Sequence, residues 1–115
     1  MLTARATLRN IRLSPRKARL IADSIRGKRV LDARDILQFS LQRAAEPVHK
    51  LLDSAVANAE WKAREERRRI DSDELIIKTI MVDEGRTFYR FQPMPRGRAG
   101  RIRHRSSHIT LTITE

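Results

Sequence analysis

Arginine is the most abundant side chain in this sequence that can bind a ligand through charge and hydrogen bonds, and it is distributed unevenly along the chain. Twenty of the 25 basic residues are arginine, and against 14 acidic residues they leave a net charge of +11. Residues 1–22 hold six basic residues and no acidic one, and residues 85–115 hold seven arginines and one acidic residue. The planar guanidinium group binds phosphate through paired hydrogen bonds and stacks on bases. Both ends are therefore predicted to meet a polyanion, either nucleic acid or an anionic membrane surface.

Side chains that serve catalysis or metal binding are few and scattered. His104 and His108 are separated by roughly 13 Å at the rise of a strand, which is too far for a shared metal ion, and His49 has no supporting cluster. The chain holds no cysteine, no phosphate-loop motif and no serine in a nucleophile elbow. The sequence therefore predicts no enzyme, no metal and no cofactor.

Apolar residues are too few and too dispersed for a membrane span or a large core. The longest apolar runs have three residues, whereas a span needs about 18. Only five residues are aromatic, so the expected core is small and aliphatic. A length of 115 residues predicts one domain, residues 1–115, and we expect no membrane partner.

Three helices are predicted to position the cations. The first follows the cap Ser14-Pro15 and ends before Gly27, the second covers about three turns from Val30, and the third opens at Glu46-Pro47. Their apolar stripes are Ala18, Ile21, Ala22 and Ile25; Val30, Ala33, Leu37 and Leu41; and Val48, Leu52, Ala55, Ala59 and Ala63. The third helix is expected to run on through Glu60–Arg69 as a solvated face, with Glu60/Arg64 and Glu65/Arg69 pairs.

From Leu75 onward the period changes to two. Residues 75–82 predict a strand covered on most of both sides, and residues 109–114 predict a strand with one buried and one wet face. Turn formers gather between them at Pro93, Pro95, Gly97 and Gly100, which predicts a hairpin with its turn near Arg96. Arms of about 16 residues reach on the order of 50 Å, against a radius of gyration of about 13 Å for a globule of this length. The hairpin, at about residues 83–107, must protrude.

Aromatic rings interleave with the arginines of the predicted hairpin. Phe88, Tyr89 and Phe91 offer faces on which bases can stack, or they pair across the two arms and hold the register. The first turn of the first helix carries Arg16, Lys17 and Arg19, which the helix dipole disfavours by about 0.3–1 kcal/mol each. A bound phosphate would reverse that sign, which makes Ser14–Arg19 a candidate grip on an RNA backbone.

Five motifs, taken in order, resemble the bacterial large-subunit ribosomal protein L-twenty-two family. They span nearly the whole chain: SPRKARLIADSIRGK (14–28), SAVANAE (54–60), VDEG (82–85), GRAGRI (97–102) and RSSHITLTI (105–113). The resemblance implies an α+β fold in which three helices pack on a small antiparallel sheet and a long β-hairpin protrudes. It also implies a structural constituent of the large subunit that contacts several rRNA domains, helps early subunit assembly and lines the polypeptide exit tunnel with the hairpin tip. The implied partners are large-subunit rRNA, neighbouring ribosomal proteins and the nascent polypeptide.

Charge pattern and resemblance together give the expected site residues. The tip, Gln92 to Arg98, departs from the family pattern at Met94 and Pro95, and Trp61–Glu74 is about five residues longer than a common bacterial form, where we expect extra helix. The expected rRNA-binding residues are Arg5, Arg9, Arg12, Ser14, Arg16, Lys17, Arg19, Arg26, Lys28, Arg86, Arg90, Arg96, Arg98, Arg101, Arg103, His104, Arg105 and His108. The expected tunnel-lining residues are Gln92, Pro93, Met94, Pro95, Arg96, Gly97 and Arg98.

Two alternatives remain open at the level of sequence. Phosphate contacts alone do not distinguish RNA from DNA, so a basic architectural DNA-binding protein fits the composition as well. Residues 1–20 are rich in arginine and free of acid, with Arg5, Arg9, Arg12 and Arg16 at helical spacing, which also fits an organellar transit segment. Pro15 and the match through residues 14–28 argue against a transit segment. The expected location is a cytoplasmic ribosome, in preference to an organellar one.

Overall fold

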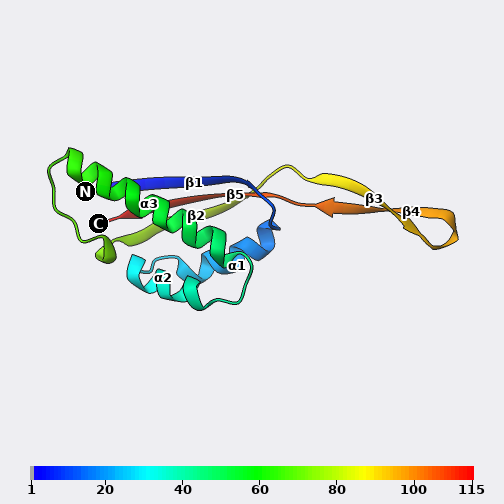
Figure 1. Ribbon diagram of the computed structural model, residues 1–115, viewed down its shortest axis with the longest axis horizontal. Helices are drawn as coiled ribbons and strands as arrows, with labels where there is room; N and C mark the ends of the chain where they lie inside the picture. The colour runs from blue at the N-terminus through cyan, green and yellow to red at the C-terminus, as the bar shows by residue number, and fades with distance from the viewer. Residues whose placement is uncertain (1) are drawn as a thin grey trace.

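The computed structural model of the chain describes residues 2–115 and has an α+β architecture (Figure 1). Three α-helices lie between the first and second strands in sequence, and one-turn 3-10 helices follow α3 and form the hairpin tip. The elements are β1 (Thr3–Ile11), α1 (Pro15–Ile25), α2 (Val30–Phe39), α3 (Ala45–Glu65), η1 (Ser72–Glu74), β2 (Ile76–Glu84), β3 (Phe88–Met94), η2 (Pro95–Gly97), β4 (Arg98–His104) and β5 (Ser107–Thr114).

The helices cover one face of a three-stranded antiparallel sheet with the order β1-β5-β2. Helix α3 packs on β1, α1 packs on β2, and α2 packs against α3. Strands β3 and β4 form a separate two-stranded ribbon that projects from the end of the sheet (Figure 1). The predicted fold class, with three helices on a small antiparallel sheet and a protruding hairpin, is confirmed.

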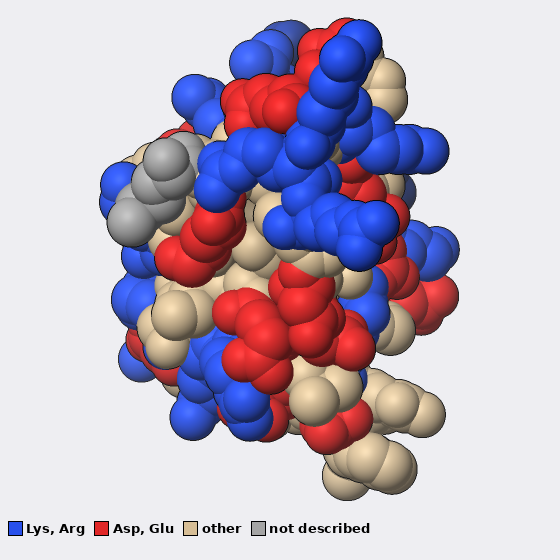
Figure 2. Space-filling model, turned by 90° about the vertical axis from the view of Figure 1, so that its left-hand side faces the viewer, with Lys and Arg blue, Asp and Glu red and all other residues tan. Residues whose placement is uncertain are grey.

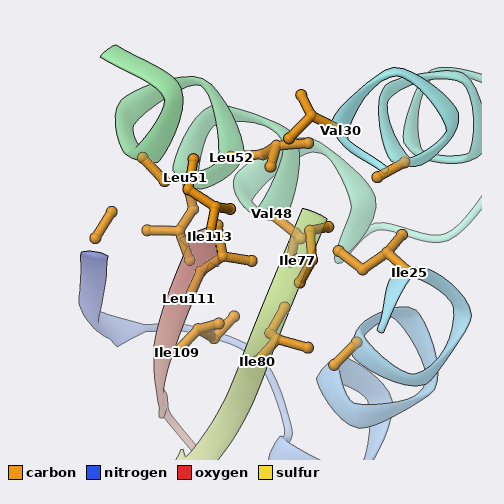
Figure 3. Close-up of a cluster of buried hydrophobic side chains, with 14 of the residues drawn as sticks. Ile25, Val30, Val48, Leu51, Leu52, Ile77, Ile80, Ile109, Leu111 and Ile113 are labelled. Carbon is orange, nitrogen blue, oxygen red and sulfur yellow. The ribbon is translucent and has the colours of Figure 1, made fainter. Parts of the chain in front are cut away.

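The core between helices and sheet is aliphatic (Figure 3). Leu52 and Val48 of α3, Ile25 of α1 and Val30 of α2 meet a row of isoleucine and leucine side chains from β5 and β2. The sheet residues are Ile109, Leu111, Ile113, Ile77 and Ile80. The expected helix stripes are buried apart from one residue: Leu41 lies beyond the end of α2 and is fully exposed. The helix stops at Phe39, so the predicted last turn is wrong.

Side chains from the helices close both edges of the sheet. Strand β1 pairs only with β5, and its outer carbonyls accept hydrogen bonds from Lys62 Nζ (2.8 Å, at Thr3) and Asn58 Nδ2 (3.0 Å, at Arg5). At the β2 edge, Arg19 donates to the Val82 carbonyl at 3.1 Å and Arg26 donates to the Ile80 carbonyl at 2.9 Å. These bonds blunt two edges that would otherwise offer unpaired backbone groups to another strand.

The N-terminal segment forms a strand that the charge pattern did not predict. Residues 3–11, whose arginines also suited an amphipathic transit helix, make the edge strand β1. Leu2, Ala4 and Ala6 alternate with Thr3 and Arg5, and the apolar set is buried under α3. This period of two is visible in the sequence, but two alanines among arginines carry little apolar weight.

Strand β2 is covered on one face only, which corrects the expectation of cover on both sides. Its register against β5 shifts between Ile77 and Thr79, so Lys78 is an extra residue in a β-bulge. The bulge places Ile77, Ile80 and Val82 together in the core and leaves Ile76 and Met81 exposed. The threonines of β5 were expected to form a solvent-exposed face, but this face is only partly exposed, because Thr110 is buried.

Helix α3 ends at Glu65, four residues before the end that the charge pairs predicted. Arg67 has a positive φ of 54°, a left-handed conformation that no α-helix continues through. Among the described residues no ion pair joins Glu60 to Arg64 or Glu65 to Arg69. The longer Trp61–Glu74 segment therefore adds a turn and the short η1 helix instead of more α-helix.

The hairpin gives the molecule its length of 68 Å, against 26 and 16 Å along the other axes. Its seven pairs run from Phe88 opposite His104 to Met94 opposite Arg98. The connecting residues Pro95, Arg96 and Gly97 turn the chain with two consecutive left-handed residues, Arg96 at φ 64° and Gly97 at φ 68°. The turn lies where the sequence placed it, near Arg96.

Candidate nucleic-acid interface

Serine hydroxyl groups fix the root of the hairpin to the start of α1. Ser107 is fully buried and donates from Oγ to the Leu13 carbonyl at 2.6 Å. Ser106 Oγ donates to the Arg86 carbonyl at 2.5 Å, and the Gly85 amide donates to the Ser106 carbonyl at 2.8 Å. A Cβ on residue 85 would lie 2.6 Å from Ser106 Oγ, so a glycine is needed here. The two basic ends of the sequence thus meet at one place.

A pocket of about 510 Å³ lies where these ends meet, and we call it the root pocket. Its lining comes from the strand-to-helix link before α1, from the α2–α3 loop and from the outgoing end of β4. The residues are Arg12, Ser14, Lys17, Arg43, Arg103, His104 and Arg105. No carboxylate lines it, and among the described residues its arginines form one ion pair, between Arg105 and Glu84 at 3.7 Å. The root pocket is therefore a candidate site for an anion.

Helix α1 adds its positive end to this pocket. Ser14 occupies the N-cap position, yet its side chain makes no capping hydrogen bond, and the first turn holds no acidic residue. The first amides of a helix have no partner inside the helix, and they attract anions together with the dipole. Lys17 lies in this turn and lines the root pocket, while Arg16 is exposed beside it. Of the expected grip at Ser14–Arg19, Ser14 and Lys17 line the root pocket, and phosphate binding there stays a prediction.

A second basic hollow lies on the face of the sheet that the helices leave open. Its volume is about 500 Å³, and its cations are Arg5 and Arg9 of β1. His108 of β5 also lines it and accepts a hydrogen bond at Nδ1 from the Asn10 amide at 3.1 Å. Asp83 lines the same hollow, so its charge is more balanced than that of the root pocket.

Along the ribbon, arginines stack on aromatic rings. The Arg101 guanidinium lies 4.5 Å from the Tyr89 ring centroid, and Arg86 and Arg90 lie 5.5 and 6.0 Å from that of Phe88. Tyr89 pairs with Arg103, so its contact to Arg101 is a diagonal one across the strands. Two of the three rings therefore pack against arginine within the ribbon, whereas Phe91 is 73% exposed and free to meet a base. Arg96 and Arg98 lie at the exposed tip.

Elsewhere on the molecule the cations are matched by acids. At the end opposite the hairpin, basic and acidic side chains intermingle (Figure 2). Arg29 bridges Asp32 (3.3 Å) and Glu74 (3.4 Å), and the hydrogen bond and charge of Asp32 raise its pKa further. Arg34 bridges Asp53 at 3.3 Å and Asp73 at 3.5 Å, and Arg68 contacts Glu115 at 2.6 Å. The largest excess of positive charge thus lies at the root, along the hairpin and on β1, the segments that contain the two basic ends of the sequence.

Three expected site residues lie along the β2 edge instead of in a basic hollow. Arg19 and Arg26 donate to β2 carbonyls, and Arg26 also pairs with Asp23. The Lys28 backbone carbonyl accepts from the Ile77 amide at 3.0 Å. The structure gives these residues a role within the fold, and contact of their side chains with RNA stays a prediction.

Arg43 is the pocket residue that sequence reasoning missed. It lies in the loop between α2 and α3, within the segment of the chain whose charges nearly cancel. Charge counting along the chain hides it, because only the folded helices bring that loop to the hairpin root. Neither spacing nor composition marks Arg43 in the sequence.

Within residues 2–115, no group of three or more histidine or acidic side chains is placed to hold a metal ion. No α-helix in that range is long and apolar enough to cross a bilayer.

Comparison with known proteins assigns this arrangement to a family. The family model described as ribosomal protein L22p/L17e matches residues 6–114. The chain belongs to the L22p/L17e family. It is 51% identical over all of its 115 residues to the large ribosomal subunit protein uL22 of Desulfitobacterium hafniense strain Y51, covering 96% of that protein. It is also 51% identical over 112 residues to the protein of that name from Syntrophotalea carbinolica, with 97% of each chain covered.

The L22p/L17e family consists of structural ribosomal proteins, so the chain is not an enzyme. The match confirms the resemblance found in the sequence motifs, because it covers the root, the hairpin and all of the sheet except its first residues.

Proposed function

We propose that the chain is a structural constituent of the large ribosomal subunit and binds large-subunit rRNA through its root pocket, its N-terminal cations and its arginine-rich hairpin. The relatives named large ribosomal subunit protein uL22 support the assembly. The expected setting is a cytoplasmic ribosome, with contacts to several rRNA domains early in subunit assembly. Exposed apolar residues at the end of α2 and in the loop after it, Phe39 and Leu41, offer surface for neighbouring ribosomal proteins.

One observation carries the rRNA proposal, namely the segregation of unpaired charge. The root and the hairpin hold cations from both ends of the sequence, and among the described residues these cations form one ion pair, Arg105–Glu84. The opposite end holds arginines bridged to carboxylates. Unpaired cations along an extended shape of 68 Å repel one another, and a polyanion that runs along them removes that repulsion.

A basic architectural DNA-binding protein is the competing function. It would use the same phosphate contacts, which carry no sequence information. The L22p/L17e match favours RNA. The two functions differ in whether duplex DNA competes with rRNA for the protein: an architectural DNA-binding protein would bind both equally well.

We expect the affinity for a large-subunit rRNA transcript to fall steeply with salt. The two end segments hold 13 basic residues. If about half of them contact phosphate, the slope of log K against log[salt] is roughly −4 to −5. Filter binding at KCl concentrations from about 50 to about 300 mM measures the slope. Duplex DNA of random sequence serves as the competitor. A slope near zero contradicts phosphate binding, and equal affinity for the DNA favours the architectural function.

The hairpin tip, Gln92 to Arg98, is proposed to line the polypeptide exit tunnel and to face the nascent chain. The tip lies at the far end of the long axis, beyond the root that anchors the protein (Figure 1). Its residues are exposed. A segment of this kind can meet a partner without support from the core.

Replacing Met94–Arg98 with Asn-Gly tests that proposal. Pro93 pairs with Ala99, so a two-residue turn closes the shortened ribbon. We expect unchanged folding and co-sedimentation with the large subunit, but altered passage of nascent peptides or altered binding of small molecules that lodge in the tunnel. The double variant Arg67→Ala with Arg69→Ala also removes two positive charges, but far from the tip, and it serves as the control. Loss of large-subunit incorporation by the shortened hairpin alone would make the tip structural.

A further inference from the structure

Next to the root pocket lies a second hollow of different chemistry, which we call the leucine pocket. Its volume is about 360 Å³. It shares Arg12, Ser14, Lys17 and Arg43 with the root pocket, so the two hollows are adjacent. Its other walls are Leu13, Leu20, Ala44 and Gln42. Apolar walls thus adjoin a strip of three cations, and no carboxylate lines either hollow.

We propose that this pair of hollows binds one unpaired RNA nucleotide, with its base in the leucine pocket and its phosphate in the root pocket. This inference rests on the proposed rRNA-binding function and specifies the form of RNA that the root takes. Bases in a duplex are stacked and do not enter such a hollow, whereas loops and bulges present bases that can be splayed out.

The lining suits a nucleotide better than an apolar peptide. Arg12, Lys17 and Arg43 demand an anion within a few ångströms of the apolar part of the ligand, which a nucleotide supplies in its own backbone. The Gln42 amide holds one acceptor and two donors, which can pair with the edge of a base. A guanidinium plane on the shared strip can stack on the base face.

Leu20 is the lining residue of the leucine pocket that we expect to contact the base. Its side chain lies in the second turn of α1, outside the buried apolar stripe of that helix, and is 59% exposed. Leu31 of α2 is a matched leucine: it is 43% exposed, lies on a helix and lines neither hollow. Exchanging either one for serine leaves the net charge and the core unchanged.

The test compares Leu20→Ser with Leu31→Ser on a large-subunit rRNA transcript. We expect Leu20→Ser to weaken binding by on the order of tenfold, because one base loses an apolar wall. The salt slope should not change, because the phosphate contacts remain. Leu31→Ser should bind within about twofold of the parent chain, as expected of a surface change away from the site. Thermal unfolding of both free variants checks that each is folded.

Chemical probing of the RNA measures the protection of individual bases, which a general weakening of electrostatic attraction would not change at one nucleotide alone. Dimethyl sulfate and a carbodiimide together report the pairing edges of all four bases. One nucleotide protected by the parent chain and by Leu31→Ser should regain reactivity with Leu20→Ser and with Gln42→Ala. If the parent chain binds with a steep salt slope but no nucleotide depends on Leu20, the nucleotide site is wrong and rRNA binding stands. If the parent chain does not bind the transcript, both proposals fail.

Discussion

Exchanging Lys17 and Arg43 for glutamate is expected to lower the affinity for large-subunit rRNA by about 10²- to 10⁴-fold. Each residue lines both hollows at the hairpin root, from α1 and from the α2–α3 loop. A hydrogen bond to a charged group contributes about 1.5–3 kcal/mol, and two such losses correspond to that range of affinity. The salt slope should also become shallower by about two, since two phosphate contacts are lost.

The same double variant should be folded, and the free protein should be as stable as before or slightly more stable. Lys17 lies in the first turn of α1, where the positive end of the helix dipole opposes a cation. Glutamate reverses that interaction, with a gain of about 0.3–1 kcal/mol. A lower melting temperature would show that these side chains support the fold and that their placement in an RNA site is wrong.

The matched control is Lys50→Glu with Arg64→Glu. Both residues are exposed on α3, line neither root hollow, and change the net charge by the same amount. We expect a much smaller loss of affinity, because charges away from the phosphate path are screened within about 10 Å at 0.1 M salt. Equal losses in both variants would mean that only the net charge matters, which contradicts a localised interface.

The helices were predictable because their signals are local. Ser14-Pro15 opens α1 and Gly27, at φ 77°, follows its end, as the capping residues indicate. The alanine stripe of α3 is buried along its whole length. The hairpin was predictable for a different reason: its arms are long, basic and bounded by turn formers, so no compact arrangement accommodates them. The family assignment also came from the sequence, through motifs spread over nearly the full chain.

What the sequence missed depends on contacts between distant segments. Strand β1 becomes clear only when β5 pairs with it, and the Lys78 bulge in β2 is set by register against the same strand. Arg43 joins the interface only because α2 and α3 bring its loop to the hairpin root. The basic residues at both chain ends are visible in the sequence, whereas the Ser107–Leu13 hydrogen bond that joins those ends appears only in the fold.

Leu111→Ala is expected to destabilise the free protein by about 2–5 kcal/mol. Leu111 is fully buried in the central strand β5, where its side chain meets the helices (Figure 3). Truncation removes transfer free energy and leaves a cavity that a tightly packed aliphatic core fills only in part. Domains of this size are stable by about 5–15 kcal/mol, so the loss is a large share of the total. Urea denaturation measures it, and Leu31→Ala, at an exposed leucine, should change stability by about 0.5 kcal/mol or less.

Binding to rRNA should restore much of that loss, because rRNA binds the folded arrangement of two chain ends that separate on unfolding. A ligand at about 100 times its Kd stabilises the folded state by about 2.7 kcal/mol. The melting temperature of Leu111→Ala should therefore rise when the rRNA transcript is added, and the rise should shrink as KCl weakens the phosphate contacts. The Lys17→Glu, Arg43→Glu variant should show little rise at the same RNA concentration. If the transcript leaves the melting temperature of Leu111→Ala unchanged at low salt, the RNA does not recognise the folded root, and the interface assigned to it is wrong.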